Sequence, residues 1–156
     1  MILMGVRDMH ILVVEDSSFN AFCLRRLLES NLQDVDVTHV SDSLQAIKAL
    51  NNQPFDLAIL DGDLNATDGL CFNGPTLADT IIQSHPMLPL IAWSDDASFQ
   101  KAFVDVFQSH HRLINDASVW PKMVTPNRII NTFQTLFGAW GQALISVLHP
   151  NYYQPQ

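Results

Sequence analysis

Residues 55–69, FDLAILDGDLNATDG, place an apolar run directly before two aspartates, Asp61 and Asp63, that are separated by one glycine. An apolar run of this length is typical of a strand that is buried on both faces. Such strands belong to parallel sheets with helices on both sides, and these sheets bind ligands beyond the carboxyl ends of their strands. The two aspartates therefore mark a candidate site at the end of a buried strand.

Short apolar runs and amphipathic stretches alternate along the rest of the chain. They predict strands at residues 10–16, 35–40, 55–60, 88–93 and 117–120, and helices at residues 17–30, 41–52, 75–85, 97–110 and 126–148. Five strands that alternate with five helices predict an α/β fold with a parallel sheet covered on both faces.

Two of these helices carry further expectations. In the helix at 17–30, Asp16 or Ser17 is available as the N-cap, and the residues at helical spacing that predict its apolar face are Phe19, Phe22, Cys23 and Leu27. The helix at 126–148 would be on the order of 33 Å long at 1.5 Å per residue, longer than the sheet needs. We expect its end to project and to need a partner, which is either the first helix of the same domain or a second copy of the chain. Gly138 and Gly141 would permit a close approach or a bend.

Composition limits the possible classes of protein. The chain has 156 residues, of which 47% are hydrophobic, so it is long enough for one compact domain. Its 16 acidic and 8 basic residues give a net charge of -8, which disfavours direct binding to nucleic acid. Cys23 and Cys71 are too few for a disulfide framework, and the longest apolar runs are too short for a membrane span. We therefore expect a soluble cytoplasmic protein.

Acidic residues follow two of the predicted strands. Glu15 and Asp16 come after the first strand and Asp61 after the third. Three carboxylates at neighbouring strand ends would repel one another unless a cation lay among them, and hard oxygen ligands suit Mg²⁺. The sequence therefore predicts a divalent-metal site.

A hydroxyl and an ammonium follow the next two strands. Ser94 and Lys122 would supply donors for the oxygens of a phosphoryl group, and such electrostatic positioning is most of phosphoryl-transfer catalysis. Asp61 would then be the nucleophile that forms an aspartyl phosphate.

Four segments in this order, ILVVEDSSFN, DLAILDGDL, LIAWSDD and VWPK, resemble the receiver domain of two-component response regulators over roughly residues 9–148. The resemblance implies a flavodoxin-like, doubly wound (βα)5 fold with a five-stranded parallel sheet in the order 2-1-3-4-5. It also implies that Glu15 and Asp16 are the acidic pair for Mg²⁺ and that Asp61 is the phosphoacceptor. The backbone carbonyl of Asp63 would be a further metal ligand. Ser94 matches the family's switch hydroxyl, and Lys122 matches the lysine that contacts the phosphoryl group.

The sequence departs from the family pattern at several positions. Met123, rather than proline, follows Lys122, and Val119 occupies the usual aromatic switch position, with Trp120 beside it. The side chain of Asp63 would add negative charge beside Asp61. Before the third helix, the Asp-Gly at residues 68–69 fits one register, and the segment NGP at residues 73–75 fits another with a longer loop. We favour the second register because Pro75 suits the first position of a helix.

The resemblance predicts a stand-alone response regulator that is not a turnover enzyme. It would comprise a receiver-like domain at residues 1–148, with an extended C-terminal helix, and a tail at residues 149–156. A histidine kinase or a histidine phosphotransfer protein would phosphorylate Asp61, and the domain would signal to a downstream protein target, with a homodimer through the last helix as a further possibility. One alternative is a receiver-like binding module that is not phosphorylated. The other is a small phosphatase of the haloacid dehalogenase type, whose Asp-x-Asp motif Asp61 and Asp63 resemble.

Overall fold

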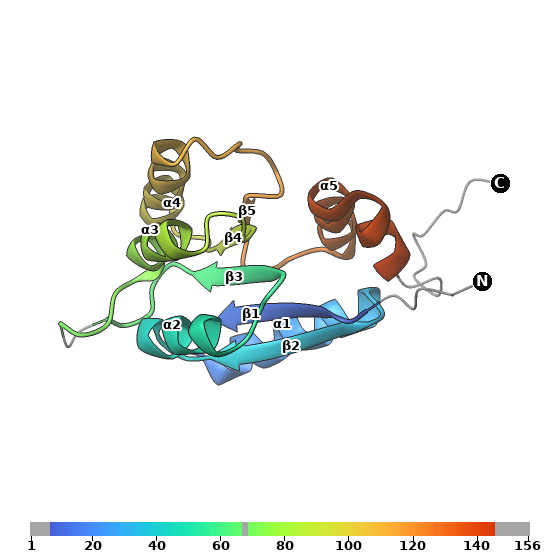
Figure 1. Cartoon of the computed structure of the whole chain (residues 1–156), viewed down its shortest axis with the longest axis horizontal. Helices are drawn as coiled ribbons and strands as arrows, with labels where there is room; N and C mark the ends of the chain where they lie inside the picture. The colour runs from blue at the N-terminus through green and yellow to red at the C-terminus, as the bar shows by residue number, and fades with distance from the viewer. Residues whose placement is uncertain (1–6, 67–68, 146–156) are drawn as a thin grey trace.

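The computed structural model describes residues 7–66 and 69–145. Strands and helices alternate through this part of the chain: β1 (Met9–Val14), α1 (Ser18–Asn31), β2 (Val35–Val40), α2 (Ser43–Asn52), β3 (Leu57–Asp61), α3 (Gly74–Ser84), β4 (Leu90–Trp93), α4 (Ala97–Ser109), β5 (Val119–Trp120) and α5 (Pro126–Leu144). All strand pairs are parallel, and the sheet order is β2-β1-β3-β4-β5 (Figure 1). The predicted fold class and strand order are confirmed.

Helices cover the sheet on both sides. The core on one face is formed with residues of α1 and α5, and the core on the other face with residues of α2, α3 and α4. In Figure 1, α2 lies in front of the sheet and α1 behind it. The central strand β3 is buried along its whole length, which explains why its sequence is an unbroken apolar run up to Asp61. No helix in the described ranges is long and apolar enough to cross a bilayer.

The apolar face predicted for α1 is wrong for most of its residues. Phe19 and Phe22 are 74% and 60% exposed, and Cys23 is exposed as well. Leu27 is partly buried against the core, whereas the buried apolar residues are Ala21, Leu24 and Leu28. Both stripes have helical spacing. The helix packs on the core through Leu24 and Leu28, with Ala21 buried on the same side, while the predicted stripe continues into the exposed Arg26.

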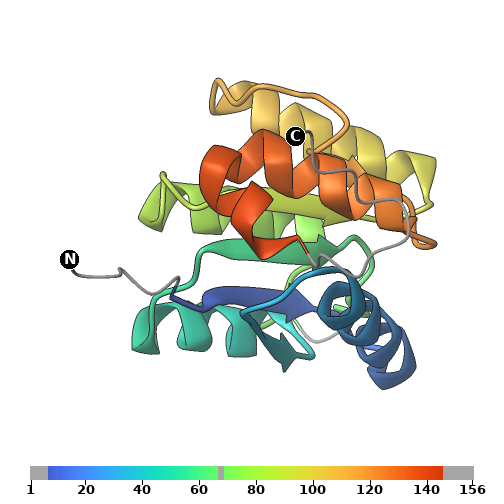
Figure 2. The ribbon, with the colours of Figure 1, turned by 90° about the vertical axis from the view of Figure 1, so that its right-hand side faces the viewer.

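The expectation that the end of the last helix projects is wrong for its described residues, whereas the bend that Gly138 permits is present. Gly138 has φ 53° and ψ −124°, so α5 turns there and its last residues run back (Figure 2). The turn brings Gly141 against the backbone of Phe133, where an added Cβ would lie 1.9 Å from the carbonyl oxygen. Glycine is needed at both places, at the first for its positive φ and at the second for the close approach.

The end of α5 therefore packs on the chain's own first helix, which is one of the two partners predicted for it. The backbone N–H of Gln33, just after α1, donates to the carbonyl of Leu144 at 2.7 Å. Leu32 forms an isolated antiparallel bridge with Ile145, and both are buried. Val147 and Leu148, at the end of the predicted helix, lie outside the described residues.

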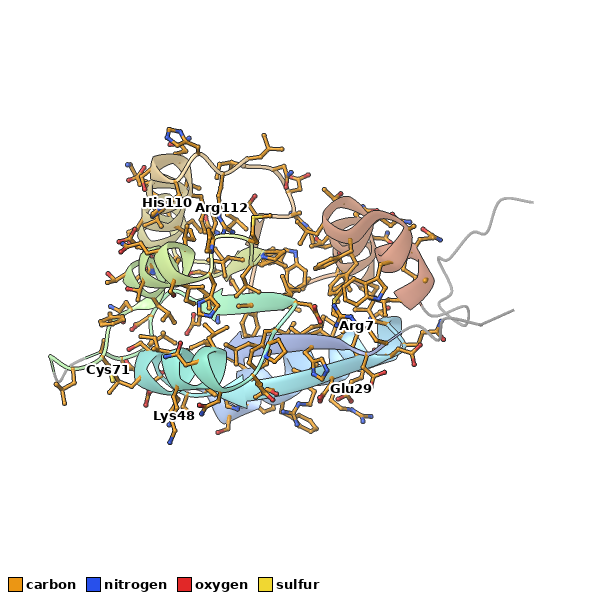
Figure 3. The ribbon with its side chains drawn as sticks, in the orientation of Figure 1. Arg7, Glu29, Lys48, Cys71, His110 and Arg112 are labelled. Carbon is orange, nitrogen blue, oxygen red and sulfur yellow. The ribbon has the colours of Figure 1, made fainter. Side chains whose placement is uncertain are left out.

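Arg7 holds the same end of the molecule. It lies between α5 and the sheet (Figure 3), where it forms an ion pair with Asp56 at 2.8 Å. Its guanidinium lies 4.5 Å from the ring centroid of Trp140, which follows the turn in α5. Arg7 and Asp56 lie at the amino ends of β1 and β3, and the candidate site lies at the opposite, carboxyl ends of the strands.

The loop between β3 and α3 has the longer of the two predicted registers. The helix begins at Gly74 with Pro75 in its first turn, as the NGP segment predicts. The N–H of Gly74 donates to the carbonyl of Gly62 at 2.8 Å, and an added Cβ at Gly74 would lie 2.0 Å from the carbonyl oxygen of Asp61. This close approach holds the end of β3, and with it Asp61, against the start of α3.

Candidate functional site

The candidate site lies at the carboxyl ends of the strands. Glu15 and Asp16 follow β1, and Asp61 is the last residue of β3. Atoms of the three carboxylates lie within 4.8 Å of one another. Glu15 is 1% exposed and Asp61 6%, whereas Asp16 is half-buried at the rim. The three predicted acidic residues are therefore brought together as a group that could hold a metal ion.

Lys122 reaches into this group from the end of β5. Its Nζ lies 2.9 Å from Oδ1 of Asp61 and 3.0 Å from Oε2 of Glu15. Buried carboxylates are stable as ions only when they are paired and hydrogen-bonded. The lysine supplies this pairing for one acid from each of two adjacent strands.

The two buried acids titrate differently. Burial, together with a hydrogen bond to Glu15, raises the pKa of Asp61 to about 7, although Lys122 opposes the change. Burial on its own would also raise the pKa of Glu15, but its hydrogen bonds with Asp61, Asn20 and Lys122 and the charge of Lys122 outweigh burial, so this pKa is below its usual value. In the absence of a further cation Asp61 therefore keeps a proton to a higher pH than Glu15, and a bound cation would favour ionisation of both.

Two asparagines belong to the site, and neither was among the predicted site residues. Asn20, in the first turn of α1, donates to Oε1 of Glu15 at 2.9 Å. Asn65, in the loop after β3, donates its carboxamide N–H to Oδ2 of Asp16. Asn65 has φ 52°, a conformation that asparagine adopts more readily than most residues. Neither residue directly follows a strand, so the strand-end positions did not mark them, although Asn20 closes the segment ILVVEDSSFN.

Ser94 follows β4 and is buried; its backbone N–H donates to the carbonyl of Trp120 at 3.0 Å, but its hydroxyl is engaged locally. Its Oγ accepts from the backbone N–H of Asp96 at 3.1 Å, and its carbonyl accepts from Nε2 of Gln100 at 2.6 Å. Ser94 is therefore at the predicted strand end, but the side chains in direct contact with the acids are those of Lys122, Asn20 and Asn65.

Comparison with known proteins places this geometry in a family. The profile of the response regulator receiver domain matches residues 11–111, which is more than half of the chain. The chain belongs to the response regulator receiver domain family. No curated protein matches the sequence significantly.

Solved structures agree with the receiver fold at low sequence identity. The signal receiver domain of an HD domain-containing protein from Pseudomonas fluorescens Pf-5 is 18% identical, with a TM-score of 0.72, over 90% of this chain and 95% of the other. The receiver domain of NtrX from Brucella abortus is 21% identical, with a TM-score of 0.66, over 81% and 96%. A CheY-like receiver domain from Methanospirillum hungatei JF-1 is 18% identical, with a TM-score of 0.66, over 82% and 92%. These likenesses confirm the fold.

The unusual residues of this receiver domain have defined structural places. The side chain of Asp63 is exposed, and its Oδ1 accepts from the backbone N–H of Asn65 at 3.0 Å, so it shapes the loop. Val119 is partly buried. Trp120 is fully buried, and its indole N–H donates to Oγ1 of Thr132 at 2.9 Å. The aromatic residue of β5 is thus fixed in the core beneath α5.

Proposed function

We propose that this receiver domain accepts a phosphoryl group on Asp61 in a Mg²⁺-dependent reaction and signals through protein contacts. The observation that carries the proposal is the position of the Lys122 ammonium, within 3.0 Å of both Asp61 and Glu15, beside a group of acids that could hold a divalent ion. If Lys122 were only a solvated surface residue and the acids only capped a helix, this close grouping would not be expected.

The carboxylates of Glu15, Asp16 and Asp61 would hold the metal, with the backbone carbonyl of Asp63 as a further ligand. The donor set fits Mg²⁺, because it consists of oxygen atoms and includes one acid at the solvent-exposed rim where water ligands can remain. When bound, the ion would neutralise the charge that gathers on the phosphoryl oxygens.

In the transfer, an oxygen of Asp61 forms a bond to phosphorus while the P–N bond of a donor phosphohistidine breaks. The electron pair of that bond goes to the imidazole nitrogen. Asp61 must be ionised to attack, and Lys122 favours the ionised form while its ammonium can move to the incoming phosphoryl oxygens. Ser94 would donate its hydroxyl to the same oxygens, which requires a change from its present turn.

The donor would be a histidine kinase or a histidine phosphotransfer protein, and a groove beside Lys122 is suited to its docking. The groove has a volume of 490 Å³, and Phe19, Trp93 and Met123 line it. Phe19 and Met123 are 74% and 87% exposed, and Lys122, which touches Asp61, forms part of the same wall. An apolar donor surface seated here would be next to the acceptor. On this proposal, Phe19→Ala should slow transfer from a phosphohistidine protein.

Four further expectations from the sequence remain predictions. These are the stand-alone architecture with one receiver-like domain at residues 1–148 and a tail, the cytoplasmic location, the downstream target and a homodimer through the last helix. The phosphatase alternative is not supported, because the chain belongs to the receiver family and Asp61 ends the third strand of its sheet. The binding module without phosphorylation is opposed by the close contact of Lys122 with Asp61.

Intact-mass measurement tests the proposal. The protein is incubated with acetyl phosphate in the presence of Mg²⁺ or of a chelator, and Asp61→Asn is treated in parallel. We expect a gain of one phosphoryl group in the wild type, only with Mg²⁺, and no gain in Asp61→Asn. A wild type that gains no phosphoryl group at saturating donor and metal, or a gain that persists in Asp61→Asn, would contradict the proposal.

A further inference from the structure

Trp93, the last residue of β4, makes two contacts with Lys122. The ammonium of Lys122 lies 3.8 Å from the centroid of the Trp93 ring. The indole N–H of Trp93 donates to the backbone carbonyl of Lys122 at 3.2 Å. The same tryptophan therefore contacts both ends of the lysine, its backbone and its charge, while it is itself 3% exposed and packed in the core.

The backbone of Lys122 is held from the end of β4. It follows β5, which has only two residues, and precedes Met123, whose side chain is exposed. The N–H of Lys122 donates to Oδ1 of Asp95 at 2.9 Å. Both backbone groups of Lys122 are therefore bonded to residues at or just after the end of β4. The location of Lys122 thus depends on the end of the neighbouring strand more than on its own.

The position of the Lys122 side chain also depends on Trp93. A lysine side chain has many rotamers, and two carboxylates alone would let the ammonium settle in several arrangements. An aromatic ring face attracts an ammonium ion, more strongly where water is partly excluded. The ring of Trp93 therefore restricts the ammonium to one side of the site, where it faces Asp61 and Glu15.

We propose that Trp93 is a positioning residue for phosphoryl transfer, which fixes the backbone of Lys122 through its indole N–H and the ammonium through its ring face. The inference rests on the proposed function of Asp61 as phosphoacceptor. Trp93 would not touch the phosphoryl group, and its effect would pass through Lys122.

If Trp93 were only a core residue, its substitution would have the same effect with or without Lys122. A double-mutant cycle therefore tests the inference. The affinity for beryllofluoride, a mimic of the phosphoryl group, is measured with Mg²⁺ by fluorine NMR. The proteins are the wild type, Trp93→Phe, Trp93→Leu, Lys122→Ala and the double variant Trp93→Leu/Lys122→Ala. A residue that acts through Lys122 should have no effect of its own once the lysine is gone.

We expect Trp93→Phe, which keeps a ring but loses the N–H, to weaken binding a few-fold, and Trp93→Leu to weaken it about tenfold. In the Lys122→Ala background, Trp93→Leu should change the affinity less than about twofold. Trp120→Phe is the matched control, because it removes a buried indole whose N–H donates to Thr132 instead, and its affinity should equal that of the wild type.

Unchanged binding by folded Trp93→Leu, or an equal loss with and without Lys122, would overturn the inference. If circular dichroism shows that Trp93→Leu does not fold, the beryllofluoride affinities of Trp93→Phe and Trp120→Phe are compared instead. Equal affinities of these two variants would overturn the inference. A wild type that does not bind beryllofluoride with Mg²⁺ would instead contradict the proposed function, and the inference would fall with it.

Discussion

The ammonium of Lys122 lies 2.9 Å from Oδ1 of Asp61, so a cation from the end of β5 is paired with the acid at the end of β3. The same ammonium contacts Glu15 after β1. One side chain thus joins three strands at the place where their carboxyl ends meet, and changes to it should affect chemistry and stability together.

Lys122→Met should slow phosphoryl uptake from acetyl phosphate at least about tenfold, because the charge that faces the reacting oxygens is removed. It should also reduce the free energy of unfolding at pH 8 by about 3 kcal/mol, since two buried acids lose their partner. Mass spectrometry and urea denaturation measure the two effects. Lys101→Met is the control, because Lys101 is exposed and pairs with Asp105 on the same helix, α4; equal effects of the two substitutions would contradict the role of Lys122.

The stability of the metal-free protein should fall as the pH rises from about 4 to about 7. The pKa of Asp61 is raised to about 7 in the folded state, chiefly by burial, so the folded protein holds a proton that the unfolded chain releases from about pH 4 upward. The stabilisation is complete below the unfolded pKa and is lost as the pH passes the folded one. The lowered pKa of Glu15 acts in the opposite direction and at lower pH, so it does not cancel this change.

Urea denaturation with a chelator at pH 5, 6, 7 and 8 measures this dependence. The loss should be on the order of 2–4 kcal/mol, and Asp61→Asn should remove most of it and be more stable than the wild type at pH 8. Asp105→Asn, on the exposed face of α4, should keep the dependence of the wild type. An equally steep profile in Asp61→Asn would show that another group is responsible.

Asn65→Gly should bind Mg²⁺ a few-fold more tightly than the wild type. The carboxamide of Asn65 donates to Oδ2 of Asp16, so it competes with a metal for this acid, and glycine keeps the positive φ of the loop at little cost. The rise of melting temperature with Mg²⁺ concentration measures the affinity. Asp16→Asn is the opposite control and should weaken binding; a weaker Asn65→Gly would mean that Asn65 supports the site.

Gly141→Ala should destabilise the domain by about 2–4 kcal/mol, because its Cβ would overlap the carbonyl of Phe133 and force the end of α5 away. Hydrogen exchange at the backbone N–H of Gln33, which donates to Leu144, reports this displacement directly. Thr135→Ala, at an exposed position of α5, should leave both the stability and the exchange nearly unchanged. Protection of Gln33 that survives Gly141→Ala would contradict the packing.

Local patterns predicted the order and type of the elements. Each strand is a short apolar run and each helix an amphipathic stretch, and these signals lie within a few residues of one another in the sequence. Because parallel strands end at one edge of a sheet, Glu15, Asp16 and Asp61 could be grouped from their positions in the chain alone. The same reasoning placed Ser94 and Lys122 at the same edge, where the structure has them.

The contacts that refine this arrangement depend on which side chains meet in space. Two stripes on α1 had helical spacing, and only packing in the folded domain decided that Ala21, Leu24 and Leu28 are buried while Phe19 and Phe22 are exposed. Likewise, the turn in α5 depends on the positive φ of Gly138 and on the contact of the end of α5 with the residues that follow α1.

The sequence by itself therefore determined the receiver fold and the group of acids at its strand ends, because apolar periodicity and strand order depend on neighbours in the chain. Only the tertiary structure decided that Trp93 supports Lys122 and that Asn65 bonds to Asp16. Those pairs join residues that are far apart in the chain, and their geometry exists only after the sheet and its loops are packed.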